Sequence, residues 1–351
     1  MKALDALFEA NKIAFSPFVF QTVNTMMELG MMDLLFETKE GQTIGQIADK
    51  TSISKYGVTV LFEMAECAEI IERDEQDRYT LTKVGFFLVR NPMTLANFHF
   101  TNKINYKGLF HLTEAIRDEK PAGLKELGEW KTIYEGLSSL KEEDKKAWFE
   151  FDHHYSDNSF GEALKIIFRQ HPKQIFDIGG NTGKWTIAST SHDENVKVTI
   201  FDLPQQIKIA KANIEDNHPN LASRVNYQPV NLLDPSSEIP GGADVYWMSQ
   251  FLDCFSEEEI EAILLKIKKH ASTDATVFIM ETFIDDQRFP AAKYSLVATS
   301  LYFTVMANGN SKMYASSVFK YILAKAGFEI VKSHQLHENS FHTILECKIK
   351  S

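Results

Sequence analysis

A glycine-rich segment near the middle of the chain carries the residues best suited to ligand binding. Residues 176–185 read FDIGGNTGKW, with Gly179, Gly180 and Gly183 closely following Asp177. A strand that leads through such a turn into a helix presents backbone N–H groups at the carboxyl edge of a sheet, where ligands bind. The glycines let a ligand approach the main chain closely. The segment therefore predicts a ligand-binding turn.

Two classes of nucleotide cofactor are bound by turns of this kind. NAD-binding folds use a GxGxxG turn, whereas methyltransferases use an acidic residue followed by a GxGxG-like turn. Here GGNTG does not match GxGxxG, and Asn181 is a residue type that tolerates left-handed backbone angles. A second acidic residue, Asp202, ends the next apolar run, where its carboxylate can accept hydrogen bonds from ribose hydroxyls. The pattern favours a methyltransferase.

The alternation of segment types in the second half of the chain predicts the strands and helices that position this turn. Seven β-rich runs alternate with helical stretches there: QIFDIG, VKVTIF, RVNYQP, ADVYWM, TVFIME, FEIVKS and FHTILECKI. Such alternation predicts an α/β fold with a doubly wound sheet. Residues 103–170 come before these runs and have mostly helical patterns, so we expect a helical linker.

The N-terminal third has a different pattern. Residues 15–36 are rich in Phe, Met, Leu and Val, and either core packing or a homodimer interface would cover this surface. Residues 43–89 follow as helix, turn, helix and hairpin, which is a winged-helix pattern. The second helix of that pattern carries Glu63, Glu66 and Glu69, the wrong charges for a major groove. We therefore do not expect DNA binding.

Length and charge bound the remaining possibilities. A chain of 351 residues exceeds the usual size of one core, so we expect two domains, 1–102 and 103–351. The net charge of −11 opposes association with phosphate backbones, and no basic patch offsets it. The sequence predicts no nucleic-acid partner.

Cysteine usage and hydropathy bear on location. The three cysteines, Cys67, Cys254 and Cys347, form no CxxC pair, which is typical of a reducing compartment and gives no metal site. Asp5 and Glu9 interrupt the start of the chain where a signal peptide would be apolar. The longest uncharged stretch contains Ser, Thr, Asn and Gly, so it is a poor membrane span. We expect a cytoplasmic protein without membrane segments.

Together these motifs resemble those of the small-molecule O-methyltransferases that include the caffeate and hydroxyindole O-methyltransferases. The likeness covers nearly the whole chain and includes DIGGNTG, FDLP, the segment NLLDPSSEIPGGADVYWMSQFLDCFSEEEI, IMET and AKAGF. It implies a seven-stranded, doubly wound (Rossmann-like) methyltransferase sheet with an N-terminal all-helical winged-helix dimerisation domain. It also implies a homodimer formed through that domain, and S-adenosylmethionine as the cofactor.

The resemblance assigns cofactor-binding roles by position. The glycine-rich turn would lie at the methionine part of the cofactor and its surroundings, and Asp202 would bind the ribose. Leu203 would lie beside the adenine, Asn231 near its amino group, and Phe255 would pack on the cofactor. In this sequence the positions are Asp177, Gly179, Gly180, Gly183, Asp202, Leu203, Asn231, Ser249 and Phe255. Asn231 stands where the family usually has Asp, and Phe255 where it has Trp. Both changes keep an acceptor or a stacking ring.

The catalytic pattern of the family is altered. Its base is a histidine in a segment of the type LHDWSDEE, which this chain writes as LDCFSEEE, so Asp253 occupies the histidine's position. Two glutamates orient that histidine in the family. Glu281 matches the first, whereas the second falls near Met313. The usual base and one of its supports are missing.

Several interpretations of this loss remain open. Asp253 can accept a proton itself, or His153 or His154 can supply a base from the preceding helix. An acceptor already ionised at neutral pH needs no base, because proximity and orientation suffice. Finally, the protein can retain the cofactor while performing another reaction or a non-catalytic role.

The acceptor pocket is assigned by position alone. In the family the helix KYSLVATSLYFTVMA lines it, so Tyr302, Phe303 and Met306 predict a flat, apolar, small-molecule acceptor.

Overall fold

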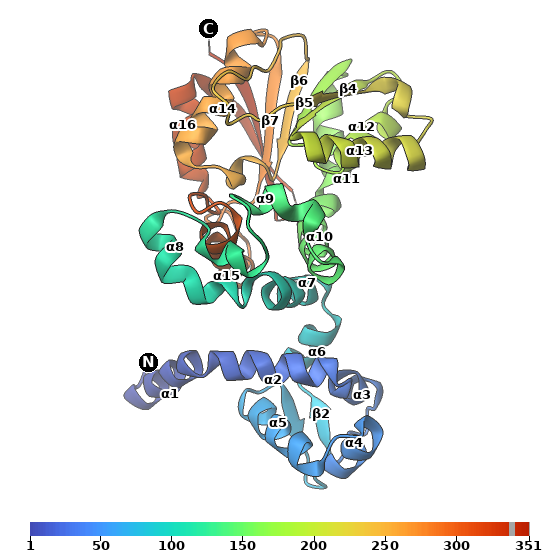
Figure 1. Cartoon of the computed structure of the whole chain (residues 1–351), viewed down its shortest axis with the longest axis vertical. Coiled ribbons are helices and arrows are strands. Elements are labelled where there is room, and N and C mark those ends of the chain that lie inside the picture. Colours follow the sequence, from blue (N-terminus) through green and yellow to red (C-terminus); the bar gives the residue numbers. More distant parts are fainter. Residues whose placement is uncertain (337–340, 351) are drawn as a thin grey trace. The chain divides into compact units, whose positions relative to one another are not determined.

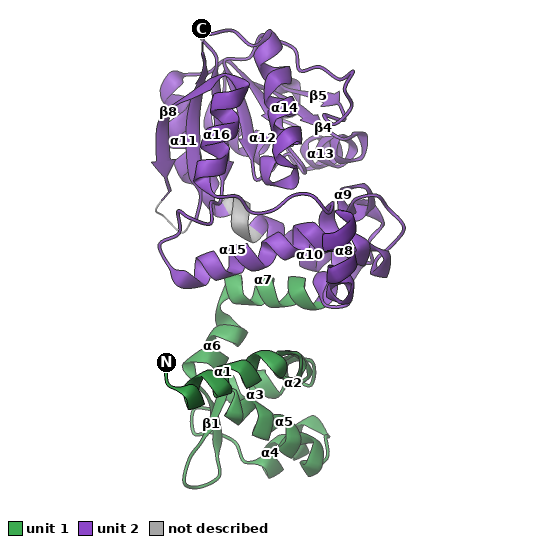
Figure 2. Ribbon diagram, turned by 90° about the vertical axis from the view of Figure 1, so that its left-hand side faces the viewer, with its two compact units in different colours: residues 1–102 green, residues 103–351 purple. Residues whose placement is uncertain are grey.

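The computed structural model describes residues 1–336 and 341–350, with residues 154–157 described by their backbone alone. The chain divides into two compact units, Met1–Asn102 and Lys103–Ser351 (Figure 2).

The first unit is helical apart from one short hairpin. Its elements are α1 (Ala3–Ala14), α2 (Ser16–Glu28), α3 (Met31–Glu37), α4 (Ile44–Thr51), α5 (Lys55–Cys67), β1 (Ile71–Arg73), β2 (Tyr79–Leu81), α6 (Lys83–Arg90) and α7 (Pro92–Phe100). The side chains of Thr43 and Ser54 cap the starts of α4 and α5, as their residue types favour. β1 and β2 pair antiparallel directly after α5, which is the helix, helix and hairpin order expected from the sequence.

Residues 15–36 divide between core and surface. Met26, Met31 and Met32 are buried in the core of this unit, whereas Phe15 and Phe18 are more than half exposed. The helix before them, α1, has no buried residue at all. Large apolar side chains on α1 and on the start of α2 therefore face solvent in the isolated chain.

A helical segment opens the second unit. It comprises η1 (Thr101–Asn105), η2 (Gly108–His111), α8 (Leu112–Asp118), η3 (Ala122–Glu126), α9 (Ile133–Gly136), η4 (Leu137–Ser139), α10 (Glu142–Ser156), η5 (Asp157–Ser159), α11 (Phe160–Ile167) and η6 (Phe168–Gln170). In Figures 1 and 2, α8, α9 and α10 gather with α15 (Pro290–Tyr302) at one end of the sheet.

The predicted seven-stranded sheet is confirmed. Its strands are β3 (Gln174–Ile178), β4 (Lys197–Asp202), β5 (Val225–Pro229), β6 (Val245–Ser249), β7 (Thr276–Glu281), β8 (Phe328–Gln335) and β9 (Thr343–Ile349). Their spatial order is β5-β4-β3-β6-β7-β9-β8, and β9 alone runs antiparallel to its neighbours. The order reverses at β3, which has β4 on one side and β6 on the other, so ligands are expected at the carboxyl ends of these strands.

Both faces of the sheet are covered, as the continuous apolar runs require. Alternate residues of β3 and β6 belong to opposite cores, for example Phe176 and Tyr246 to one and Ile175 and Trp247 to the other. The first core packs against α14 (Glu257–His270) and α16 (Ser316–Ala326). The second packs against α11 and α12 (Lys184–His192), where Trp185 stacks on Trp247 with ring centroids 4.2 Å apart. The remaining helix, α13 (Pro204–Asn217), packs near β4.

Candidate active site

The glycine-rich turn joins β3 to α12 and depends on three residues with positive φ. These are Gly179 (φ 76°), Asn181 (φ 49°) and Gly183 (φ 81°). Asn181 thus takes the left-handed conformation that its residue type permits. At Gly179 a Cβ atom would lie 2.1 Å from the ring of Phe251, so only glycine fits. This contact joins the turn to the loop that follows β6.

Asp202, at the end of β4, ties two loops together. Its Oδ2 accepts a hydrogen bond from the Asn181 amide (2.8 Å), and its Oδ1 accepts one from the Leu203 amide (2.7 Å). Burial raises the pKa of this carboxyl to about 6. Each oxygen has accepted one hydrogen bond, which leaves lone pairs for further donors such as hydroxyls.

Asp177 lies behind the turn. It is 2% exposed, and its Oδ2 accepts a hydrogen bond from the Thr186 hydroxyl at 2.6 Å. Burial raises its pKa to about 7, against the lowering effect of that hydrogen bond. A Cβ atom at Gly180 would lie 2.9 Å from the same oxygen, and one at Gly183 would lie 2.9 Å from Ile214. These three residues shape the turn from within the fold.

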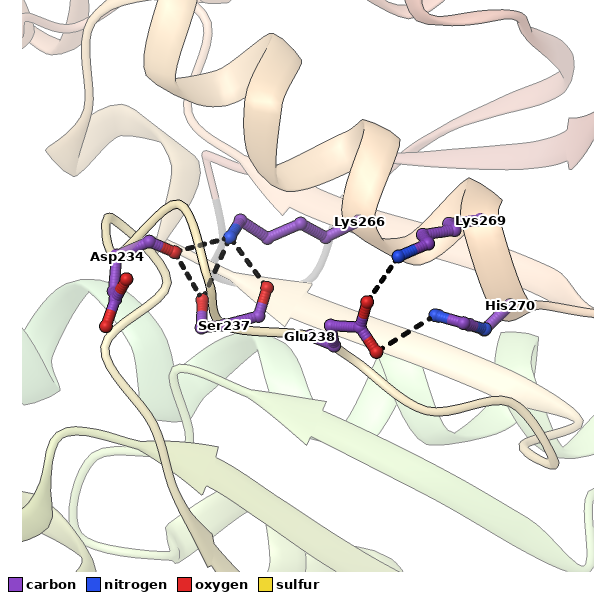
Figure 3. A network of polar contacts seen from close by, with 6 residues as sticks. All are labelled: Asp234, Ser237, Glu238, Lys266, Lys269 and His270. Atoms are coloured by element: carbon purple, nitrogen blue, oxygen red, sulfur yellow. Dashed lines mark hydrogen bonds and ion pairs between the residues drawn. The ribbon is translucent and has the colours of Figure 1, made fainter.

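The loop after β5 is held on α14 by a lysine (Figure 3). Lys266 donates to the backbone oxygens of Asp234 (2.6 Å) and Ser237 (2.8 Å) and to the Ser237 hydroxyl (2.9 Å). Beside it Glu238 pairs with Lys269 and His270. These contacts fix the loop that follows β5.

Asn231 begins that fixed loop. Its side-chain oxygen accepts a hydrogen bond from the Leu233 amide at 3.0 Å, and its backbone oxygen accepts one from Asp234 at 3.1 Å. The amide oxygen of Asn231 therefore shapes the loop, and its NH2 group is the side chain's donor to a ligand.

The loop after β6 contains Asp253, one of the predicted proton acceptors. Asp253 lies in the short helix η8 (Leu252–Cys254) and is 5% exposed. Glu281, at the end of β7, holds this loop because its Oε1 accepts hydrogen bonds from the amides of Phe251 (3.2 Å) and Leu252 (3.0 Å). Glu281 is 1% exposed, and its side chain accepts hydrogen bonds from backbone amides. It therefore holds the loop in position.

The acidic groups of this loop have displaced pKa values. Burial raises the pKa of Asp253 to about 7, and the nearby Asp152 adds to the rise. Burial and then the charge of Asp253 raise the pKa of Glu281 well above its ordinary value. Burial also raises the pKa of the Cys254 thiol, which keeps its proton and donates to Asp253 Oδ1 at 3.6 Å. A carboxyl poised near pH 7 is suited to proton transfer.

The helix predicted to line the acceptor pocket changes from an α-helix to a π-helix near its C-terminal end. Tyr302 accepts a hydrogen bond from Trp148 Nε1 at 2.8 Å. Residues 303–307 continue as a π-helix, η9 (Phe303–Ala307), which shifts the side-chain register. Met306 is fully buried, and a Cβ atom at Gly108 would lie 2.0 Å from its sulfur. Met306 therefore packs inside the fold.

The histidines expected on α10 differ from Asp253 in their surroundings. The ring of His153 stacks on Phe149 with centroids 5.6 Å apart, and its Nδ1 lies 3.8 Å from Asp152 Oδ2. The side chain of His154 lies outside the described residues. No histidine side chain among the described residues lines the cavity between the loops.

One cavity of about 330 Å³ connects the ends of the strands with the helical segment. Of the residues predicted for the site, it is lined by Gly179, Asp202, Leu203, Asn231, Asp253, Phe255, Tyr302 and Phe303. The predicted residues that lie outside its lining are His153, Asp177, Gly180, Gly183, Ser249, Glu281 and Met306. Its volume suits a small organic ligand.

Sequence reasoning missed part of the wall. The additional lining includes Tyr134, Trp148, Phe151 and Asp152 from α9 and α10, together with Gln250 and Cys254 after β6. In the sequence, only the many aromatic residues of α10 could have indicated a role in the cavity wall. The other residues could not be predicted, because the helices that carry them lie far from the glycine-rich turn along the chain.

A family model described as the O-methyltransferase domain matches residues 110–329, which contain every residue of this cavity. The chain belongs to the O-methyltransferase family. A model described as the Dimerisation2-like domain matches residues 8–79.

The similar proteins described here match nearly the whole length of this chain. Acetylserotonin O-methyltransferase of Gallus gallus is 22% identical over 326 residues, which cover 90% of each chain. Among solved structures, the S-adenosylmethionine-dependent methyltransferase SibL has a TM-score of 0.72 at 19% identity and covers 97% of this chain and 98% of its own. Human N-acetylserotonin methyltransferase, solved with its cofactor, has a TM-score of 0.68 at 17% identity and covers 100% and 99%.

This family membership makes the protein an S-adenosylmethionine-dependent O-methyltransferase. The residues present fit that cofactor, because the cavity combines a backbone turn that only Gly179 permits, the Asp202 carboxylate and the ring of Phe255. None of the described helices combines the length and the hydropathy that a bilayer crossing requires.

The buried Asp177 predicts a specific pH dependence of stability. Its folded-state pKa of about 7 lies above the ordinary value of 3.8, so folding binds a proton and stability falls as pH rises from about 4 through 7. In Asp177→Asn the share of this loss that comes from Asp177, on the order of a few kcal/mol, should disappear, because the amide oxygen still accepts the Thr186 hydroxyl. The shares of Asp202 and Asp253, whose pKa values burial also raises, should remain, so the slope becomes shallower. Urea unfolding followed by tryptophan fluorescence measures it, since all four tryptophans lie in the second unit.

The control is Asp216→Asn on the exposed face of α13, which should keep the wild-type slope. A slope in Asp177→Asn as steep as that of the wild type would contradict the prediction.

Proposed function

We propose that this enzyme methylates a hydroxyl oxygen of a small aromatic or conjugated acceptor, with Asp253 as the proton acceptor. The observation that carries the proposal is the position of Asp253, a nearly buried carboxyl in the cavity wall, on the loop that also packs against the glycine-rich turn. When bound, S-adenosylmethionine supplies a methyl group that is attached to a sulfonium sulfur. After the transfer this sulfur is the thioether of S-adenosylhomocysteine.

Each part of the cofactor is assigned to residues that can contact it. Asp202 accepts hydrogen bonds from the ribose hydroxyls, because each of its oxygens has a lone pair left. The backbone of Gly179 and Asn181 meets the methionine part, while Leu203 and Asn231 border the adenine. Phe255 packs on the cofactor, and Asp177, Gly180, Gly183 and Ser249 support the walls behind it.

The acceptor half of the cavity is aromatic. Tyr302 and Phe303 form one part of its wall, and Trp148 and Phe151 form another. The Trp148–Tyr302 hydrogen bond fixes both rings, so the wall favours a flat ligand. Similarity to a protein named acetylserotonin O-methyltransferase supports a small aromatic acceptor here.

Asp253 takes the hydroxyl proton as the O–CH3 bond forms. Its pKa of about 7 makes it a stronger base than an ordinary carboxylate, and Glu281 holds it in place through the loop amides. His153 is the alternative base, but it stacks on Phe149 and does not line the cavity. The proton therefore goes to Asp253.

We propose further that the functional unit is a cytoplasmic homodimer, with residues 1–102 as its dimerisation domain and residues 103–351 as its catalytic domain. The Dimerisation2-like match at residues 8–79 supports this division. The exposed apolar side chains of α1 and α2 support it too, because a partner subunit would cover them. They include Leu4, Leu7, Phe8, Ile13, Phe15 and Phe18.

Cofactor binding is tested by titrating S-adenosylhomocysteine in a calorimeter. Asp202→Asn should weaken binding by about 10- to 100-fold, because a charge-assisted hydrogen bond to ribose is lost. Asp216→Asn, which alters an exposed acid on α13, should bind like the wild type. Failure of the unaltered protein to bind would refute the assignment.

The role of Asp253 is tested by labelled methyl transfer to catechol. Asp253→Asn should lower kcat by about 10²- to 10⁴-fold and abolish the rise of kcat with pH, because the base is lost. The loss should be much smaller with 4-nitrocatechol, which is largely ionised at neutral pH and needs no base.

The matched variant His153→Gln should keep the wild-type pH profile. If His153→Gln loses activity while Asp253→Asn keeps it, or if no aromatic hydroxyl is methylated, the proposed role of Asp253 is wrong.

A further inference from the structure

The charged side chains that line the cavity all have the same sign. They are Glu135, Asp152, Asp202, Asp253 and Glu259, and no lysine, arginine or histidine lines it among the described residues. A concave site with charges of one sign focuses a field that attracts ligands of the opposite sign. The acids must therefore be divided between the cofactor and the acceptor.

Two of the five belong to the cofactor side. Asn181 in the glycine-rich turn donates its backbone N–H to Asp202 and its side-chain NH2 to Asp152 Oδ2 at 3.2 Å. Both carboxylates therefore border the cofactor turn, where a sulfonium and an amino group bring positive charge.

A third acid is occupied by the fold. Glu259 Oε2 accepts hydrogen bonds from the Ser256 amide (2.8 Å) and from Asn310 Nδ2 (3.4 Å), since it completes the capping box of α14. Its charge is held at a helix N-terminus, which is favourable in itself.

Asp253 and Glu135 remain for the acceptor. The structure shows no ion pair for either one among its described residues. Glu135 is exposed on α9, next to Tyr134 in the cavity wall, and its Oε2 accepts only a long hydrogen bond (3.4 Å) from the Lys131 amide. Glu135 thus offers an unneutralised carboxylate at the rim of an aromatic cavity.

We infer that the acceptor carries a positively charged group, such as a protonated amine, beside its aromatic hydroxyl, and that acceptors carrying a carboxylate are rejected. Glu135 attracts the cation, and the aromatic rings of Trp148 and Phe151 in the cavity lining are side chains of the kind that favour it through cation–π interaction. A carboxylate in the same place would meet only like charge, and no cation in the described lining would pair with it. This inference rests on the proposed methyl transfer and narrows its acceptor.

The inference is tested with three catechols that differ in one substituent. Dopamine is cationic, 4-ethylcatechol is neutral and 3,4-dihydroxyphenylacetate is anionic at pH 7. With the full-length protein saturated with S-adenosylhomocysteine, calorimetry should show dopamine binding about tenfold more tightly than 4-ethylcatechol, and the anionic catechol binding most weakly. Glu135→Gln should reduce the preference for dopamine, whereas Glu215→Gln, an exposed acid on α13, should leave it unchanged.

Equal affinities, a preference for the anionic catechol, or a failure to bind dopamine would overturn the inference. An undiminished preference for dopamine in Glu135→Gln would overturn it as well, because Glu135 is the carboxylate that attracts the cation. Absence of S-adenosylhomocysteine binding in the first step would instead overturn the proposed function, so the two failures are distinguishable.

Discussion

The buried carboxylate of Glu281 fixes the loop on which the site depends. Its Oε1 binds the amides of Phe251 and Leu252, and Phe251 fills the space that the missing side chain of Gly179 leaves. The cofactor turn and the loop that carries Asp253 are therefore built around one another. Because Glu281 is 1% exposed, these two hydrogen bonds lie in a poorly solvated place, where losing an acceptor would leave buried amides unpaired.

Much of this arrangement is predictable from the sequence, because it depends on local patterns. The seven β-rich runs correspond to the seven strands, and the central strands β3, β6 and β7 are buried on both faces between helices. The turn at Gly179–Gly183 is predictable because few residue types adopt its backbone angles.

The rest depends on distant contacts and on register. The sequence matches Glu281 with a group that orients a base, whereas the structure shows it bound to two backbone amides. Position in the family places Met306 with Tyr302 and Phe303 in the acceptor pocket, but the chain continues as a π-helix at Phe303–Ala307, and Met306 packs in the core against Gly108. The side chains of α9 and α10 reach the cavity only through tertiary packing.

In the proposed mechanism, an aspartate as the base affects more than the proton transfer. An aspartate is a weak base in water, and burial in the cavity wall raises its pKa to about 7, where it can take a proton. An aspartate also leaves the described lining of the cavity without a cation-forming side chain, because its other charged groups are all acidic. In the proposed mechanism, one residue thus bears on both the strength of the base and the charge of the acceptor.

The most direct test of Asp253 is a crystal structure with S-adenosylhomocysteine and a bound catechol such as dopamine. Proton transfer to Asp253 requires one of its carboxylate oxygens within about 2.5–3.0 Å of the acceptor hydroxyl oxygen. Finding His153 or His154 at that distance, or no side chain of the protein at all, would contradict it.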